Sequence, residues 1–555
     1  MMNRARKWRL LLSAAAVVVV ATLGLAACGG GDKETNGGTT GGGEPKAGGT
    51  YNFPISANPV SIEPLNAQET EGMHVTHQAF EGLVKYVLGD DGNMKVEPCI
   101  AESWEANEDA TVFTFKLKKG VMFQPPVNRE VKAQDFVDSW NRVTLEENAS
   151  DVSYILAAIK GCEDTGYQTD PAAGLTGLKA LDDYTLEVTL RYSFAEFPDT
   201  LGHSVAAVTP VDYIEEIGPK AYFKKPVGTG PYMVEEWVDN QKIELVKNPE
   251  YWDKENAGYV DRIHMPIILE ASTEWLEFQK GTVDMCRVPP GQVKPAENNP
   301  KVQSGEWSTK KWPQTSTYFV FVNMANSTMG NDPELRQALA YSANAEAVIN
   351  VAREGVPTPA TGIIPPGTPG FREGQSPYGY NPDKAKELLG GKTASINYWY
   401  NTDEAHQKVA EVLQAGWKSV GIDVKLSNFE WGTYLDKLSN NDKPGSPEVF
   451  RLGWVTDYPS MDGWVYPLFH SSQKGSNNYS FYDNPEVDKL MVDARSETDA
   501  TKRQDMYAEA EQIVLKDVAV IPIYFYREFR VMNNRVQNQI LNPMNFVDMW
   551  TVWVK

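Results

Sequence analysis

The sequence predicts an α/β protein that folds into two or three lobes. The chain has 555 residues, of which 41% are hydrophobic, and this is ample for more than one packed core. Strand-like and helical apolar patterns alternate after residue 49 without a clean repeat. At 404–426 a helical stripe passes directly into an alternating strand. Repeated helix-to-strand units are typical of sheets that are covered by helices.

The first half of the chain favours short strands around one amphipathic helix. Apolar side chains alternate in strand-like fashion within 111–123, 184–190 and 242–248. Between the first two, residues 133–143 have apolar side chains at helical spacing. A Gly- and Pro-rich stretch at 224–237 predicts a turn that leads into a pair of strands.

The second half repeats one way of starting a helix. Residues 331–342, 381–389 and 484–494 each begin with Asn or Asp, followed by Pro and then acidic residues. This order predicts a capped helix with Pro in its first turn. The C-terminal run at 518–533 predicts a long strand. If that strand returns to an earlier lobe, it creates a hinge.

The charge balance argues against nucleic acid as a partner. The formal net charge is −22, so the basic footprint that nucleic acid requires is missing. The acidity suits a soluble exported protein, and repulsion of anionic ligands is the alternative. The 15 Trp and 25 Tyr residues are side chains that contact ligands at low entropic cost.

The N-terminus has the pattern of a secretory signal. Four basic residues precede an apolar stretch of 18 residues that ends in Leu-Ala-Ala-Cys at 25–28. This ending resembles a bacterial lipobox, in which Cys28 receives a diacylglyceryl group and becomes the first residue after cleavage. An uncleaved transmembrane helix is the alternative, but the segment is borderline in length. We expect a signal peptide at 1–27 and a flexible Gly-rich tether at 28–49.

Three cysteines remain after Cys28, and they allow at most one internal disulfide. They are Cys99, Cys162 and Cys286. No CxxC pair occurs, which argues against zinc ribbons and thioredoxin-type sites. We predict a Cys99–Cys162 disulfide.

No catalytic motif is complete. Ser204 lies in a GxSxG-like stretch with Ala206 in place of the second Gly, and that motif requires a strand, a sharp turn and a helix. His74 and His77 have the i,i+3 spacing of a shared metal site, but no HExxH occurs. Paired acids for glycoside hydrolysis must face each other across a cleft, which a sequence does not show. A binding protein is favoured, and an exported hydrolase is the enzyme alternative.

An ordered series of segments resembles a known family. The chain is similar to the solute-binding lipoproteins of ABC importers in the peptide/nickel-binding family, most closely the oligopeptide-binding proteins. The similar segments are 80–86, 100–143, 178–190, 228–237, 248–253 and 399–436.

The resemblance implies a periplasmic-binding-protein-like type II clamshell with an additional domain, whose two main lobes are joined by a hinge and enclose the ligand. The implied segments are 50–92, 205–312 and 526–555 for lobe I, 93–204 for lobe II and 313–525 for lobe III.

The resemblance also implies a binding site. In the oligopeptide-binding members, an Asp in a G-W-x-x-D-Y motif receives the peptide α-ammonium group, and Asp457 matches this Asp. Gly453 would let a peptide backbone approach closely. The other positions that match the family's pockets are Arg451, Trp454, Trp431, His406, Tyr526 and Tyr154.

Some positions depart from the family pattern. Pro125 and Pro126 replace a short turn, Ser316 and Val455 replace a disulfide pair of some relatives, and 440–448 is an insertion. Arg451 could also pair with Asp457 in the empty protein, which would weaken the assignment of Asp457.

These implications define the expected function. We expect a monomer without cofactor, metal or catalytic residue that captures oligopeptides outside the cytoplasm and docks on membrane permease subunits. The lipid on Cys28 would hold it at the membrane. The rival ligand is a nickel chelate or another small solute. In that case Asp457 is structural, and His74, His77 or Arg451 matter more.

Overall fold

The computed structural model describes residues 44–67 and 69–555, without the side chain of Trp431. The predicted signal peptide, Cys28 and most of the tether lie outside the described residues.

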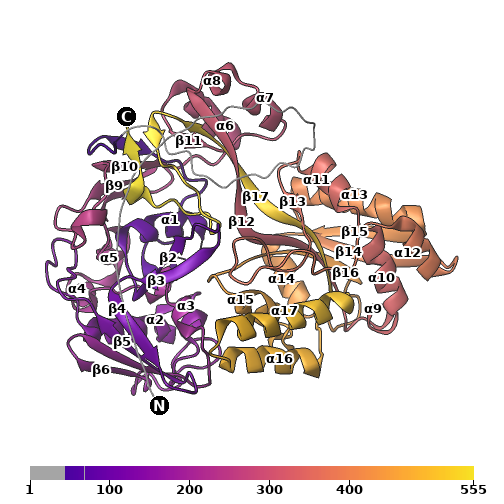
Figure 1. The fold of residues 1–555 in the computed structure, drawn as a ribbon, viewed down its shortest axis with the longest axis horizontal. Helices are drawn as coiled ribbons and strands as arrows, with labels where there is room; N and C mark the ends of the chain where they lie inside the picture. The colour runs from indigo at the N-terminus through magenta and orange to yellow at the C-terminus, as the bar shows by residue number, and fades with distance from the viewer. Residues whose placement is uncertain (1–43, 68) are drawn as a thin grey trace, which may run out of the picture. The chain divides into compact units, whose positions relative to one another are not determined.

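The N-terminal half contains two four-stranded sheets and a hairpin (Figure 1). The first sheet has the order β1-β10-β9-β8, the second has the order β4-β5-β7-β6, and β2 pairs with β3. The bounds are β1 Thr50–Asn52, β2 Val84–Leu88, β3 Met94–Pro98, β4 Ala101–Ala106, β5 Val112–Leu117, β6 Leu178–Asp182, β7 Thr185–Thr189, β8 Tyr232–Val238, β9 Lys242–Lys247 and β10 Arg262–Pro266.

The largest sheet has the order β11-β17-β12-β16-β14-β15, with β13 paired to β17. Its strands are β11 Met285–Cys286, β12 Trp307–Val322, β13 Thr358–Pro359, β14 Ala394–Asn401, β15 Ile422–Phe429, β16 Val449–Val455 and β17 Val520–Asn533. A short pair, β18 Val536–Gln537 and β19 Trp553–Val554, lies near the C-terminus.

Helices connect and cover these sheets (Figure 1). In the first part of the chain they are α1 Thr70–Ala79, α2 Ala133–Thr144, α3 Phe197–Thr200, α4 Val211–Ile217, α5 Pro219–Lys224, α6 Ala271–Lys280, α7 Val293–Glu297 and α8 Pro300–Gln303. In the rest they are α9 Ser327–Asn331, α10 Pro333–Ser342, α11 Ala345–Ala352, α12 Pro382–Leu389, α13 Glu404–Val420, α14 Trp431–Ser439, α15 Asp462–Phe469, α16 Pro485–Ser496 and α17 Ala500–Lys516.

The predicted elements are confirmed where the sequence pattern was clear. Helices α10, α12 and α16 are capped by the side chains of Asp332, Asn381 and Asn484, each followed by Pro. Helix α13 ends at Gly421, whose φ of 103° is a left-handed conformation that favours glycine. Strand β15 follows at once, as the pattern at 404–426 predicts.

Two long strands connect separate hydrophobic cores. Trp307 of β12 and Val531 of β17 belong to the core around Phe278. Further along the same strands, Tyr318 and Ile523 belong to the core that α10, α12 and α13 cover. Strands β12 and β17 run side by side between these regions (Figure 1). The C-terminal run therefore returns to a part of the fold built from earlier residues.

The predicted Cys99–Cys162 disulfide is wrong. Both residues, and Cys286, are free buried thiols. The Cys99 thiol donates to Glu81 at 3.7 Å, whereas the Cys162 thiol donates to the Gly166 carbonyl oxygen at 3.6 Å. Each thiol thus has its own polar partner in a different part of the fold.

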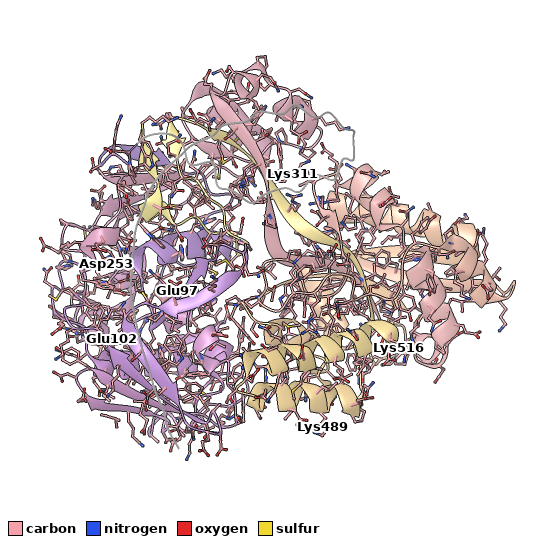
Figure 2. All side chains as sticks on the ribbon, in the orientation of Figure 1. Glu97, Glu102, Asp253, Lys311, Lys489 and Lys516 are labelled. Carbon is pink, nitrogen blue, oxygen red and sulfur yellow. The ribbon has the colours of Figure 1, made fainter. Side chains whose placement is uncertain are left out.

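The surface of the described residues is polar. Exposed charged side chains, among them Glu97, Glu102 and Lys489, point outward from β3, β4 and α16 (Figure 2). Within 44–67 and 69–555, no helix combines the length and the apolar character that crossing a membrane requires.

Candidate ligand-binding site

The G-W-x-x-D-Y motif spans the end of strand β16 and the turn that follows it. The strand lies between β12 and β14, and Gly453 is opposite Tyr318 of β12. A Cβ atom at Gly453 would lie 3.0 Å from Nη2 of Arg451 and 3.3 Å from the hydroxyl of Tyr526. The glycine therefore leaves open the place where Arg451 and Tyr526 meet.

Arg451 is a buried cation whose partners are neutral. Its Nη1 donates to Oδ1 of Asn401 at 2.9 Å, and its Nη2 donates to the Tyr526 hydroxyl at 3.0 Å. Its guanidinium group lies 4.8 Å from the ring centre of Tyr318. No carboxylate of the described part of the chain forms an ion pair with it. A buried charge without a counterion is costly, so this place suits an anionic group of a ligand.

Asp457 is the complementary case, a half-buried carboxylate whose partner is a hydroxyl. It follows β16, and its Oδ2 accepts a hydrogen bond from Tyr154 at 2.9 Å. Burial raises the pKa of Asp457 to about 6, although the bond from Tyr154 lowers it. The Arg451–Asp457 pair that the sequence left open does not form. Asp457 is therefore ready to bind a cation.

His406 joins the Arg451 end of the site. It lies in the first turn of α13, and its ring centre is 5.6 Å from that of Tyr318. Burial, and then the nearby charge of Arg451, lower the pKa of His406 to about 3. The imidazole is neutral at pH 7 and can donate or accept a hydrogen bond. Only 16% of its side chain is exposed, so it is no ordinary surface residue.

Sequence reasoning missed three residues of this end. Tyr318 and Asn401 contact Arg451 directly, and the Arg353 guanidinium lies 5.7 Å from the ring centre of Tyr524. Tyr318 stands in an apolar run that predicts only a core strand. Arg353 follows α11 without any motif.

Trp454 is a half-buried residue of β16 whose indole group is hydrogen-bonded. Its Nε1 donates to the carbonyl oxygen of Gly463 at 2.8 Å, and its ring packs against the core that α15 and α17 cover. This contact ties the end of β16 to the start of α15. The side chain of Trp431 is outside the described residues, so its predicted role stays a prediction.

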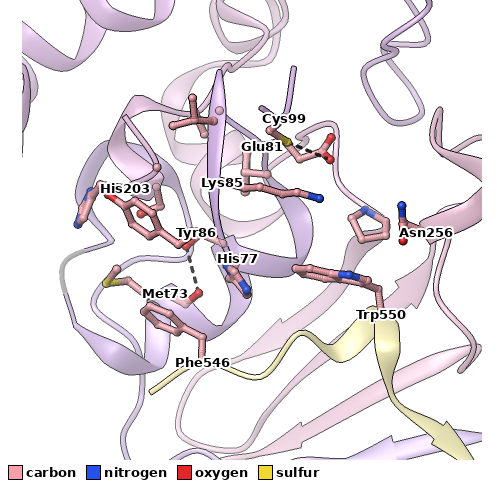
Figure 3. A pocket seen from close by; sticks show the side chains of 18 of the residues that line it. Met73, His77, Glu81, Lys85, Tyr86, Cys99, His203, Asn256, Phe546 and Trp550 are labelled. Carbon is pink, nitrogen blue, oxygen red and sulfur yellow. Dashed lines mark hydrogen bonds between the residues drawn. The ribbon is translucent and has the colours of Figure 1, made fainter. Parts of the chain in front are cut away.

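A cavity of about 80 Å³, which neither Arg451 nor Asp457 lines, lies between α1, β2 and the C-terminal segment (Figure 3). Ser204 and His77 line it, but they do not form a catalytic pair. Ser204 opens a short 3-10 turn after α3, and its hydroxyl has no hydrogen-bond partner. His77 instead contacts Asp548 at 2.8 Å. The strand–turn–helix setting of a nucleophile elbow is therefore not present at Ser204.

Comparison with known proteins identifies the family. The model of the bacterial extracellular solute-binding proteins, family 5 middle, matches residues 95–476. The chain belongs to this family. Its members are substrate-binding proteins of transporters, and the fold of this solute-binding protein is the type II clamshell that the sequence predicted.

Individual relatives cover nearly the whole chain. The oligopeptide-binding protein OppA of Bacillus subtilis is 32% identical over 89% of this chain and 91% of its own length. Among solved structures, the unliganded open form of the periplasmic murein tripeptide-binding protein MppA is 26% identical over 92% of this chain and 97% of its own, with a TM-score of 0.77. Haemophilus influenzae OppA in complex with the peptide RPPGFSPFR is 27% identical over 92% of this chain and 100% of its own, with a TM-score of 0.71.

The raised pKa of Asp457 predicts a stability effect. Because the folded-state pKa is above that of an unfolded Asp, stability is highest below the unfolded value and falls as the pH rises through about 6. Asp457→Asn is therefore expected to raise the free energy of unfolding of the empty protein by about 1–2 kcal/mol near pH 7.5, but not near pH 4. Urea denaturation at both pH values measures this. Asp423→Asn, at an exposed position of β15, is the matched control, and equal effects of both variants would contradict the assignment.

Proposed function

We propose that this protein captures oligopeptides between its lobes as the substrate-binding component of an ABC importer. One observation carries the proposal. An uncompensated cation, Arg451, and an uncompensated carboxylate, Asp457, lie at opposite ends of one short segment of β16 and the turn after it. A peptide is a zwitterion with an ammonium group at one end and carboxylates elsewhere, so it supplies a counterion to each.

The identity of the relatives supports the peptide as ligand. The Bacillus subtilis relative is named as an oligopeptide-binding protein, and the Haemophilus influenzae structure contains a nonapeptide. In this proposal Asp457 and Tyr154 receive the ammonium group, and Gly453 admits the peptide backbone. Arg451, His406 and Tyr526 bind a carboxylate or polar side chain. Trp454 and Trp431 line the side-chain pockets, and the peptide main chain pairs like a strand.

A hinge would let the ligand enter and leave. We assign the hinge to the middle of β12 and β17, where the proposed boundaries between residues 312 and 313 and between 525 and 526 fall. Lobe I would be 50–92, 205–312 and 526–555, lobe II 93–204, and lobe III 313–525. The separate cores at the two ends of these strands support this division.

The partners outside the ligand are permease subunits and the membrane. The Leu-Ala-Ala-Cys sequence supports a lipid anchor on Cys28, and the Gly-rich tether supports a body held outside the cytoplasm. The protein would act as a monomer without catalysis.

A small solute such as a nickel chelate is the second candidate ligand. Native mass spectrometry of protein purified without denaturation separates the two. A ladder of peptide masses supports the proposal, whereas one small mass or a metal supports the rival. Hydrolysis of added peptides would instead support an enzyme.

Removing the Asp457 carboxylate is expected to weaken peptide binding. Asp457→Ala leaves the ligand ammonium group buried without a counterion, so the expected loss is about 2–5 kcal/mol of binding free energy. Isothermal titration calorimetry with one defined peptide measures it. N-acetylation of that peptide should weaken binding to the wild type but cause little further loss in the variant. Unchanged affinity of Asp457→Ala would remove this residue from the site.

The same group predicts a pH dependence of affinity. The carboxylate binds the ammonium group only when ionised, and its pKa is about 6. A peptide amino group stays largely protonated from pH 5 to 7. Affinity should therefore fall about tenfold from pH 7 to pH 5. Asp199, whose pKa burial raises to about 8, also titrates nearby, so Asp457→Asn is the control. A tenfold fall that persists in this variant would assign the effect to another group.

The lipid anchor is tested in cells. Cys28→Ser removes the thiol that would be acylated, so the protein should move from the membrane fraction to the soluble extracytoplasmic fraction. Its peptide affinity should be unchanged. Mass spectrometry of the N-terminal peptide of the wild type should show two or three acyl chains, and an unmodified Cys28 would contradict the anchor.

A further inference from the structure

Tyr458, the last residue of the G-W-x-x-D-Y motif, has a role that the proposed function does not assign. Its hydroxyl donates to Oδ2 of Asp462 at 2.8 Å. Asp462 is fully buried and forms a two-pronged ion pair with Arg495, whose Nε and Nη2 each lie 2.8 Å from one of its oxygens. Bidentate pairs of this kind fix geometry as well as charge.

Two tyrosines share the Asp462 carboxylate. Tyr507 of α17 donates to Oδ1 at 2.9 Å, while Tyr458 donates to Oδ2. Burial alone would raise the pKa of Asp462, but Arg495 and the two hydroxyl groups hold the pKa below its usual value. Asp462 is thus a fixed, ionised acceptor, and each oxygen receives one nitrogen and one hydroxyl group.

The backbone of the turn is held as firmly as the Tyr458 ring. The Tyr458 carbonyl oxygen accepts hydrogen bonds from the Thr456 hydroxyl at 2.7 Å and from the Ser460 amide at 2.8 Å. A Cβ atom at Gly463 would lie 2.7 Å from the Thr456 hydroxyl and 3.4 Å from the Tyr458 ring. The turn is therefore packed directly against the start of α15. Asp457 lies between Thr456 and Tyr458, which are joined by a hydrogen bond.

The ion pair is itself fixed from several elements. Arg495 comes from α16, and its guanidinium lies 3.3 Å from the ring centre of Tyr466 in α15. Its carbonyl oxygen accepts from the Ala195 amide at 2.8 Å, and its guanidinium lies 5.0 Å from the Phe194 ring. The pair therefore also fastens the segment before α3 to α15 and α16.

We propose that Tyr458 is a positioning residue, which the Asp462–Arg495 pair holds so that it orients the Asp457 carboxylate toward the ligand ammonium group. This inference rests on the proposed function. Without the hydroxyl bond, the Tyr458 ring and the turn gain freedom, and Asp457 samples orientations that do not meet the ammonium group. Loss of alignment weakens a directional, charge-assisted bond more than it weakens contacts with the rest of the peptide.

Tyr458→Phe and Tyr507→Phe form a matched pair of variants. Each removes one hydroxyl donor from the same carboxylate and keeps the ring, so their effects on stability should be similar. Only Tyr458 adjoins Asp457. The readout is the ratio of dissociation constants for an N-acetylated peptide and the same peptide with a free amino group. We expect this ratio to fall about tenfold in Tyr458→Phe and to stay at the wild-type value in Tyr507→Phe.

Each outcome decides one point. An unchanged ratio in Tyr458→Phe, or an equal fall in both variants, would overturn the positioning role. A wild type that does not distinguish the two peptides would overturn the proposed use of Asp457, and this inference with it. Arg495→Lys keeps the charge but loses the two-pronged geometry, so it should lower the ratio in the same direction as Tyr458→Phe. A ratio unchanged in Arg495→Lys would separate Tyr458 from the ion pair and contradict the inference.

Discussion

The half-buried Asp457 and the fully buried Asp462 are held in opposite states, and the proposed binding site depends on the difference. Asp462 has Arg495 as a counterion, and its pKa lies below the usual value. Among the described residues, the partner of Asp457 is the Tyr154 hydroxyl alone, and the pKa of Asp457 rises to about 6. The paired acid gives rigidity, whereas the unpaired acid keeps its affinity for a cation. A cation placed between them would satisfy Asp457 and end its ability to bind a ligand.

The position of Arg451 within β16 explains why it does not neutralise Asp457, which follows the strand. Arg451 lies inside β16, which ends at Val455, and a strand rises about 3.3 Å per residue, so its Cα is about 13 Å from that end. Pairing with β12 on one side and β14 on the other keeps the strand from bending. Asn401 and Tyr526 give the guanidinium neutral partners instead. The sheet thus holds two opposite charges near each other without letting them meet.

The sequence was sufficient for elements with local causes, and insufficient for contacts between distant segments. The caps of α10, α12 and α16 and the passage from helix α13 into strand β15 follow from neighbouring residues, and they were predicted. Asp457 was found only through its motif, because nothing local identifies its partner Tyr154, 303 residues away. The wrong Cys99–Cys162 disulfide has the same origin, since spacing along the chain does not give the distance between two thiols. Tyr318 was missed because a strand residue in an apolar run has no local sign that its ring lies beside a buried arginine.

The contact between Tyr154 and Asp457 is compatible with ligand binding rather than a competitor for it. An ionised carboxylate has about four acceptor positions, and Tyr154 occupies one of them. An ammonium group brings three donors and a full charge, so it can bind beside the hydroxyl and strengthen the ionised form. Ligand capture would then lower the pKa of Asp457 and release a proton near pH 6, while the hydroxyl stays in place. Tyr154 therefore stabilises the empty site and leaves Asp457 able to bind a cation. A lysine or arginine at the same place would pair with Asp457 and block the ligand ammonium group.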